Sequence, residues 1–134
     1  LHGDANPGNM LVPKEGGERP LYLIDQQPFD WSITTWAGAF DLAYVMALYW
    51  PTDLRRTLEI PVLRHYQLQL AARGITDYPW AQLHADYRLC VALMVPVAVE
   101  YMRDGGDPAW NDFRFGLVQR TLTAFDDLHC GELL

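Results

Sequence analysis

Lysine is almost absent from this chain, and no glycine-rich phosphate-binding loop is present. Lys14 is the single lysine, and it lies in a polar turn between two short apolar segments. Neither G-x-G-x-x-G nor G-x-x-x-x-G-K-[ST] occurs, and the pairs Gly16-Gly17 and Gly105-Gly106 are flanked by charged residues, as in turns. These absences exclude a phosphate cradle of either common type within the chain.

Positive charge, cysteine and long apolar runs are also scarce. Ten Lys and Arg face 17 Asp and Glu, a formal net charge of -7, which argues against nonspecific nucleic-acid binding. Cys90 and Cys130 form neither a C-x-x-C pair nor a disulfide framework, which favours reduced thiols in a cytoplasmic protein. The longest apolar run, 89–99, contains Pro96 and is shorter than the roughly 20 residues of a membrane span. We therefore expect no nucleic-acid or membrane partner.

The first 25 residues hold the most informative pattern. His2, Asp4 and Asn9 follow one another within a short Gly- and Pro-containing segment, and an apolar stretch from Leu21 ends at Asp25. A carboxylate such as Asp4 is suited to orient an attacking hydroxyl and accept its proton. An amide oxygen and a second carboxylate, from Asn9 and Asp25, are suited to a hard cation such as Mg²⁺. The spacing is typical of phosphoryl transfer in protein-kinase-like folds.

Three segments carry a resemblance to a known family: 2–9 with its His-Gly-Asp and Asn, 23–25 with Leu-Ile-Asp, and 38–44 with Gly-Ala-Phe-Asp-Leu-Ala-Tyr. Together they resemble the aminoglycoside phosphotransferase and choline-kinase-like superfamily, most of all its ecdysteroid-kinase-like (CHK-like) branch, which often has a Gln where this chain has Gln27. Gln26 departs from the pattern, because the family usually has an aromatic residue there.

The resemblance implies an ATP-dependent small-molecule kinase with Mg²⁺ and ATP as cofactors. Asp4 would be the catalytic base, and His2 would brace its loop. Asn9 and Asp25 would hold the metal, and Asp41 would support the catalytic loop. From the residues alone, Asp41 could instead only favour the start of a helix. The implied acceptor is a hydroxyl group of a small molecule.

The resemblance also implies a missing partner lobe. Such kinases place a nucleotide-binding lobe before the catalytic loop, whereas this chain starts at that loop and has Leu1 in place of an initiator methionine. We therefore expect a C-terminal-lobe fragment with negligible turnover alone, and an exposed apolar surface where the other lobe would pack. A second hypothesis is a truncated, non-catalytic remnant that acts as a helical binding module.

The expected fold is mainly α-helical with a small β-hairpin (an α+β fold), the helical lobe of a kinase-like phosphotransferase in one domain of 134 residues. Residues 1–30 would form the catalytic loop and metal-binding hairpin, and 36–134 the helical subdomain. Apolar runs predict strands over 10–12 and 21–24. Helical spacing and stop signals predict helices over 39–50, 52–73, from Trp80 onward, and from Pro108 onward. We expect Thr52-Asp53 to cap the second helix, and Pro61 and Pro96 to divide or kink their helices.

Two further interpretations remain open. His2, Asp4 and Asp25 could belong to a metal hydrolase, but such sites draw on several histidines, and the three others lie far apart: His65, His84 and His129. A polar and aromatic cluster could line an acceptor site, or it could be a solvated turn between helices. Its members are Glu100, Tyr101, Asp104, Asp107, Trp110 and Asp112.

Overall fold

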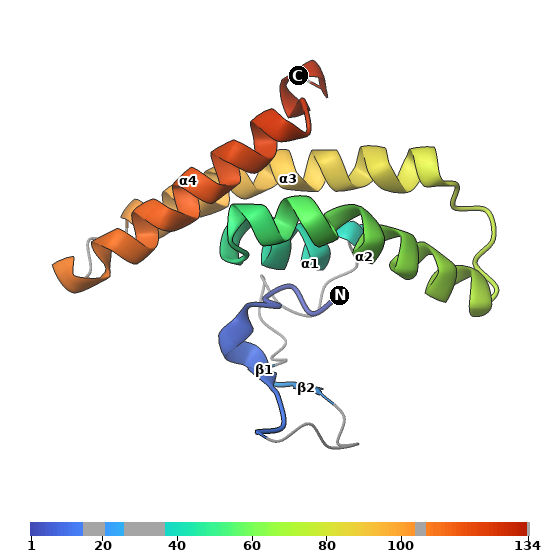
Figure 1. Ribbon diagram of the computed structural model, residues 1–134, viewed down its shortest axis with the longest axis horizontal. Helices are drawn as coiled ribbons and strands as arrows, with labels where there is room; N and C mark the ends of the chain where they lie inside the picture. The colour runs from blue at the N-terminus through green and yellow to red at the C-terminus, as the bar shows by residue number, and fades with distance from the viewer. Residues whose placement is uncertain (15–20, 26–36, 104–106, 134) are drawn as a thin grey trace.

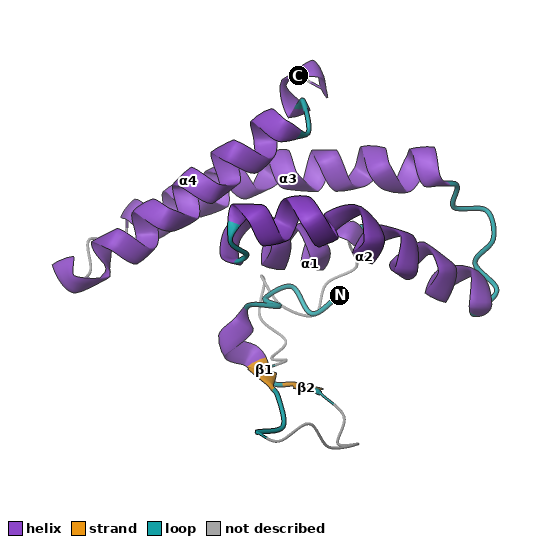
Figure 2. Cartoon of the chain, in the orientation of Figure 1, coloured by secondary structure: helices purple, strands orange, loops and turns teal. Residues whose placement is uncertain are grey.

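The computed structural model describes residues 1–14, 21–25, 37–103 and 107–133, and it is mainly helical with one two-stranded antiparallel sheet (Figures 1 and 2). The expected secondary-structure content is confirmed. The strands are β1 (Met10–Leu11) and β2 (Tyr22–Leu23), and the α-helices are α1 (Ala39–Ala43), α2 (Thr52–Ala72), α3 (Trp80–Arg103) and α4 (Asn111–Asp127). Short 3-10 helices cover Pro7–Asn9, Pro108–Trp110 and Cys130–Leu133. Within the described residues, no helix is long and apolar enough to cross a membrane.

Helix α3 packs against α4 and against the segment 39–49, and most of the buried core residues lie on α3 and on that segment (Figure 1). The sequence predicts Leu83, Tyr87, Val91, Met94 and Val95 on one face of α3. The first four are buried and Val95 is partly buried, because their spacing repeats the helical period. The sequence also predicts one apolar stripe along the last helix; Leu117 and Thr121 of that stripe are buried, and Phe125 and Leu128 are partly buried. Trp110 and Phe113, at its start, are exposed. That part of the prediction is wrong, because the first turn of α4 extends past the packed body.

Pro61 and Pro96 do not divide their helices. Each lies inside one continuous helix, Pro61 in α2 and Pro96 in α3. Both prolines are exposed. A helix tolerates the missing backbone hydrogen bond on its solvent side, where water can satisfy the freed carbonyl. The predicted break is therefore wrong.

The helix expected over 39–50 is two different helices in succession. Regular α1 is followed by a π-helical segment, Tyr44–Tyr49. The Nε of Arg120, on α4, donates to the carbonyl oxygen of Leu48 at 2.7 Å, which satisfies an acceptor near the end of this segment. Arg120 loses water there, and this burial lowers the pKa of its guanidinium.

Helix ends follow the sequence signals in part. The cap of α2 is Pro51, and Thr52 is already the first helical residue without a side-chain cap bond, so the Thr52-Asp53 cap is wrong. The expected end at Gly74 is confirmed by its positive φ of 89°, a conformation that glycine adopts without strain. Asp107 accepts from the N–H of Ala109 at 2.9 Å, as expected for a cap before Pro108.

A buried ionic cluster joins α2 to α3 and α4. Both carboxylate oxygens of Glu59 accept from Arg55 at 3.1 Å, and Tyr87 on α3 donates to Glu59 at 2.8 Å. Asp127, at the end of α4, also pairs with Arg55, and with Arg56 at 2.8 Å. The hydrogen bond from Arg56 is the main cause that lowers the pKa of Asp127.

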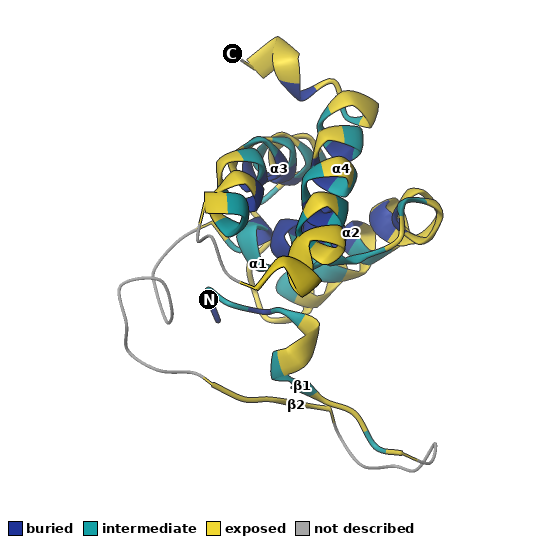
Figure 3. Ribbon diagram, turned by 90° about the vertical axis from the view of Figure 1, so that its left-hand side faces the viewer, coloured by how far each residue is buried: buried dark blue, intermediate teal, exposed yellow. Residues whose placement is uncertain are grey.

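The hairpin projects from the helical body and carries the N-terminal loop (Figure 3). Met10 pairs with Leu23 and Leu11 with Tyr22, and the N–H of Ile24 donates to the carbonyl of Asn9 at 2.9 Å. The strands are shorter than expected but have the expected pairing partners. Apolar side chains of the hairpin are exposed to solvent: the exposed fraction is 52% for Leu11 and 58% for Tyr22. Outside the described residues lie most of the turn that the sequence predicts over 13–20, the turn at Gly105-Gly106, and the irregular segment predicted over 26–35, which holds Gln26 and Gln27.

Candidate active site

Asp41 holds the N-terminal loop against the helical body. It lies in the first turn of α1, and its two carboxylate oxygens accept from two successive backbone N–H groups: His2 at 2.7 Å and Gly3 at 2.9 Å. Gly3 has a positive φ of 83°, a conformation that glycine adopts without strain and that turns the chain toward Asp4. The Asp41 carboxylate therefore binds the N-terminal loop, and no side chain caps the start of α1.

His2 links this loop to the hairpin. It is 4% exposed. Its Nε2 lies 2.9 Å from the carbonyl oxygen of Ile24, and its Nδ1 lies 3.3 Å from the backbone N–H of Asp4. A carbonyl only accepts and an N–H only donates, so the proton of the neutral ring resides on Nε2. The imidazole thus spans the short distance between the loop and the end of β2.

Asp4 stands at the centre of a set of donors. Its Oδ1 accepts from the Nδ2 of Asn6 at 3.0 Å and from the hydroxyl of Tyr44 at 2.9 Å. Its Oδ2 accepts from the Nδ2 of Asn9 at 3.1 Å. Among the described residues, Oδ2 therefore has one donor where Oδ1 has two, and a carboxylate oxygen has two lone pairs. Oδ2 is the oxygen with room for a further donor.

Asn9 and Asp25 lie at the same end of the hairpin, where Ile24 is the residue opposite Asn9. The backbone bond from Ile24 to Asn9 sets the two residues at the same end of the sheet. The Nδ2 of Asn9 donates to the backbone oxygen of Asp4 at 2.9 Å as well as to its carboxylate. Both amide protons are thus used on Asp4, so the amide oxygen of Asn9 is directed away from it.

This donor set fits a hard divalent cation. One amide oxygen, one carboxylate and the remaining positions filled by water and phosphate oxygens are the ligands that Mg²⁺ prefers. Asp25 has a positive φ of 63°, a conformation that Asp and Asn tolerate better than most residues. Within the described residues, no group of three or more His, Cys, Asp and Glu is arranged to hold a metal ion. A metal ion held by Asn9 and Asp25 would need its further ligands from a bound nucleotide and from water.

Tyr44, which bonds to Asp4, is linked to Tyr101 and through it to Tyr49; Tyr44 and Tyr49 were not predicted as site residues, whereas Tyr101 was named in the possible acceptor cluster. The hydroxyl of Tyr44 lies 2.8 Å from that of Tyr101, and the hydroxyl of Tyr49 lies 3.4 Å from that of Tyr101. Burial raises the pKa of Tyr44 and of Tyr49 well above the ordinary value, so both phenols keep their protons. The sequence pointed to Tyr44 only as the end of the family-like segment 38–44, and to Tyr101 only as a member of the polar and aromatic cluster.

The polar and aromatic cluster of the α3–α4 region divides into two parts. Tyr101 reaches the site through Tyr44. Glu100 pairs instead with Arg103 at 2.6 Å on the exposed side of α3, and Trp110 is 58% exposed. Asp107 caps the following turn, and Asp104 lies outside the described residues. Apart from Tyr101, the described members are exposed, as in the solvated-turn interpretation.

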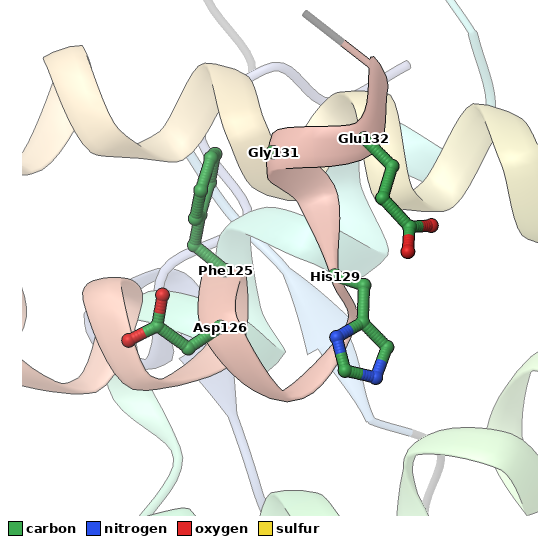
Figure 4. A pocket seen from close by; sticks show the side chains of 5 residues that line it. All are labelled: Phe125, Asp126, His129, Gly131 and Glu132. Atoms are coloured by element: carbon green, nitrogen blue, oxygen red, sulfur yellow. The ribbon is translucent and has the colours of Figure 1, made fainter.

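The remaining histidines lie away from Asp4. His65 is exposed on α2, and His84 stacks on Trp80 with ring centroids 5.4 Å apart. His129 lines a surface depression of about 280 Å³ at the C-terminal end of α4 (Figure 4). Its other lining residues are Phe125, Asp126, Gly131 and Glu132. The structure places none of these histidines with His2, so the metal-hydrolase interpretation has no supporting cluster among the described residues.

Comparisons with protein-family profiles, curated proteins and solved structures were made for the whole chain. None of them finds a match. The functional interpretation therefore rests on the arrangement of the residues themselves. That arrangement has one carboxylate with room for a hydroxyl donor, Asp4, with Asn9 bonded to it and Asp25 at the same end of the hairpin as Asn9.

Proposed function

We propose that this chain is the catalytic lobe of a small-molecule kinase that transfers the γ-phosphate of ATP to a hydroxyl group. The carrying observation is the loop fixed around Asp4. Its backbone is held by Asp41 and its side chain by Asn6, Asn9 and Tyr44. In phosphoryl transfer the protein acts mainly through positioning and charge stabilisation. A carboxylate fixed in this way is suited to that task.

Asp4 has the role of base in this proposal. Its Oδ2, with one donor among the described residues, would accept a hydrogen bond from the acceptor hydroxyl. That bond orients the hydroxyl oxygen toward the phosphorus, and the proton passes to the carboxylate as the new oxygen–phosphorus bond forms. His2 and Asp41 act at one remove, because they hold the loop that carries Asp4.

Asn9 and Asp25 would hold Mg²⁺ with the nucleotide. Bound magnesium supplies charge neutralisation on the transferring phosphate and its leaving group. The chain contributes the fixed direction of the Asn9 amide, set by its two bonds to Asp4. Any movement of Asp4 would therefore also disturb a metal ligand.

The proposal includes a nucleotide-binding lobe as partner, in the same or another polypeptide. The chain has no glycine-rich phosphate loop, and Lys14 is exposed at the far end of the hairpin. Apolar side chains that a partner would cover are exposed close by, at 68% for Val12 and 58% for Tyr22. The identity of the acceptor alcohol is open.

Titration calorimetry of MgATP against the full gene product tests the metal and nucleotide part of this proposal. Asp25→Asn keeps a residue that tolerates positive φ and removes only the charge. It should weaken Mg²⁺-dependent ATP binding at least about tenfold, the effect of losing roughly 1.4 kcal/mol of metal–carboxylate interaction. Asp77→Asn, at an exposed position in the α2–α3 loop, is the matched control and should bind as the wild type does.

Two outcomes would count against the proposal. If folded wild-type protein binds no ATP in the presence of Mg²⁺, the kinase function is wrong, and a non-catalytic helical module becomes the better description. If Asp25→Asn and Asp77→Asn bind equally well, nucleotide binding does not use the Asn9–Asp25 pair, and the metal assignment is wrong.

A further inference from the structure

The hydroxyl groups of three tyrosines form one chain that ends on Asp4. Tyr44 lies 2.9 Å from Asp4 and 2.8 Å from Tyr101, and Tyr49 lies 3.4 Å from Tyr101. Each phenol has a single proton. An ionised carboxylate only accepts hydrogen bonds, so the hydroxyl of Tyr44 must donate to Asp4, and the hydroxyl of Tyr101 must donate to Tyr44. The oxygen of Tyr101 is then left to accept from Tyr49, and every bond in the chain points toward Asp4.

The π-helical segment is what brings two of these tyrosines together. In a regular α-helix, residues three and four apart are neighbours on one face. In a π-helix the backbone bond spans five residues, and Tyr44 and Tyr49 are five apart. Their rings lie side by side with centroids 5.7 Å apart. Arg120 of α4 holds the end of this segment through Leu48, so the register of the tyrosines depends on a contact between helices.

We propose that Tyr44 and Tyr101 are positioning residues for the base, and that the π-helical segment serves to place Tyr44, the residue of this pair that it contains. This rests on the proposed kinase function. Tyr44 and Asn6 both donate to Oδ1 and so fix the plane of the carboxylate. Oδ2 is thereby aimed at the acceptor hydroxyl. Tyr101 acts through Tyr44, because a donor that itself accepts a hydrogen bond is polarised and donates more strongly.

The functional test uses water as acceptor, since ATP hydrolysis needs no knowledge of the natural alcohol. The water oxygen bonds to the γ-phosphorus, the bond from that phosphorus to the bridging oxygen of ADP breaks, and the water proton passes to Asp4 and then to solvent. Tyr44→Phe in the full gene product should lower kcat about tenfold to a hundredfold, the order of loss expected from a misplaced reacting group. KM for ATP should stay within about twofold, because Tyr44 is not proposed to contact nucleotide.

Tyr78→Phe is the matched control. It also removes a phenol bonded to a carboxylate, since Tyr78 donates to Asp86 at 2.6 Å, but that pair lies at the start of α3. It should leave kcat unchanged. Tyr101→Phe should lower kcat less than Tyr44→Phe does, because Tyr101 acts indirectly. Equal kcat values for Tyr44→Phe and Tyr78→Phe would overturn the proposal.

A second measurement tests the chain of hydroxyls without any turnover. NMR of protein with labelled tyrosine rings follows the exchange of each hydroxyl proton with solvent. The proton of Tyr44 should exchange more slowly than that of exposed Tyr22, and Tyr101→Phe should accelerate it. The hydrogen-bonded chain of hydroxyls would be contradicted if the hydroxyl proton of Tyr44 exchanged as fast as that of Tyr22, or if Tyr101→Phe left its exchange rate unchanged.

The two measurements separate the possible failures. If wild-type protein hydrolyses ATP no faster than Asp4→Asn, the proposed function fails, and the exchange rates alone decide whether the tyrosines hold Asp4. If wild-type protein is active and Tyr44→Phe is equally active, the kinase function stands and the positioning role is wrong.

Discussion

Asp41→Asn should release the N-terminal loop without unfolding the helical body. The wild-type carboxylate accepts from the backbone N–H groups of His2 at 2.7 Å and Gly3 at 2.9 Å. Asparagine has nearly the same shape but one oxygen only, so its NH₂ group would face one of these N–H donors. Hydrogen bonds to a charged group contribute about 1.5–3 kcal/mol each. We therefore expect the loop to lose about 2 kcal/mol of local stability.

Amide hydrogen exchange measures this loss at single residues. Since 1.36 kcal/mol corresponds to a factor of ten, the amide of Gly3 should exchange about 30-fold faster in Asp41→Asn. The amide of Met94, in the core of α3, should keep its wild-type rate, because the loop contributes nothing to that part of the core. Asp53→Asn, an equal change at an exposed acidic residue in the first turn of α2, is the control.

Two results would refute this reasoning. An unchanged rate at Gly3 would mean that Asp41 does not hold the loop in solution. An equal acceleration at Gly3 and Met94 would mean that Asp41 supports the whole fold, so that its hydrogen bonds to the loop are not its main contribution.

Three further predictions concern stability and reactivity. Glu59→Gln leaves Asp127 as the acidic partner of buried Arg55 and should lower the unfolding free energy in urea titrations by less than the roughly 3–5 kcal/mol of an unpaired buried charge; an unchanged midpoint would contradict the buried pair. A methyl group at Gly38 would lie 1.9 Å from the hydroxyl oxygen of Tyr66, so Gly38→Ala should lower the melting temperature, and Tyr66→Phe added to it should recover part of the loss. Burial raises the pKa of the Cys90 thiol from 9.0 to about 11, so a thiol reagent at pH 8 should modify it only after denaturation. Between pH 9 and pH 11 the Cys90 thiol is ionised in the unfolded chain but still protonated in the folded protein. Its contribution to the free energy of unfolding should therefore fall as pH rises from 9 to 11.

The local parts of the fold could be read from the sequence because short-range chemistry decides them. Gly74 ends α2 through a conformation that glycine adopts freely, and Asp107 with Pro108 starts the next helical turn. The buried face of α3 follows from apolar spacing alone. The hairpin follows from two apolar runs around a polar turn. In each case the deciding residues lie within a few positions of one another.

The parts that failed depend on tertiary contacts. Whether Pro61 breaks a helix depends on which side of the helix meets solvent, and the sequence pattern does not state this. The π-helical register of Tyr44–Tyr49 is tied to Arg120, which is 72 positions away from its acceptor. Tyr101 lies 57 positions from Tyr44. Contacts at such separations have no signature in one sequence.

The candidate site was predictable to a similar extent. The pattern around Asp4 singled out the loop residues, and the structure brings His2, Asn9 and Asp41 to it. Asn6 was missed although it lies two positions from Asp4, because its role depends on a loop turn in which it also accepts from Gly8. The catalytic and metal roles of these residues stay predictions.

Transfer of the γ-phosphate is the most direct test of the central claim. The measurement incubates the full gene product with Mg²⁺, ATP labelled at the γ-phosphate and a panel of small-molecule alcohols, and follows label in the alcohol. We expect Mg²⁺-dependent labelling of at least one alcohol, and Asp4→Asn should lower the rate by about 10²–10⁴, the usual contribution of a general base. If folded wild-type protein labels no alcohol and binds no ATP, or if Asp4→Asn labels an alcohol at the wild-type rate, the account is contradicted.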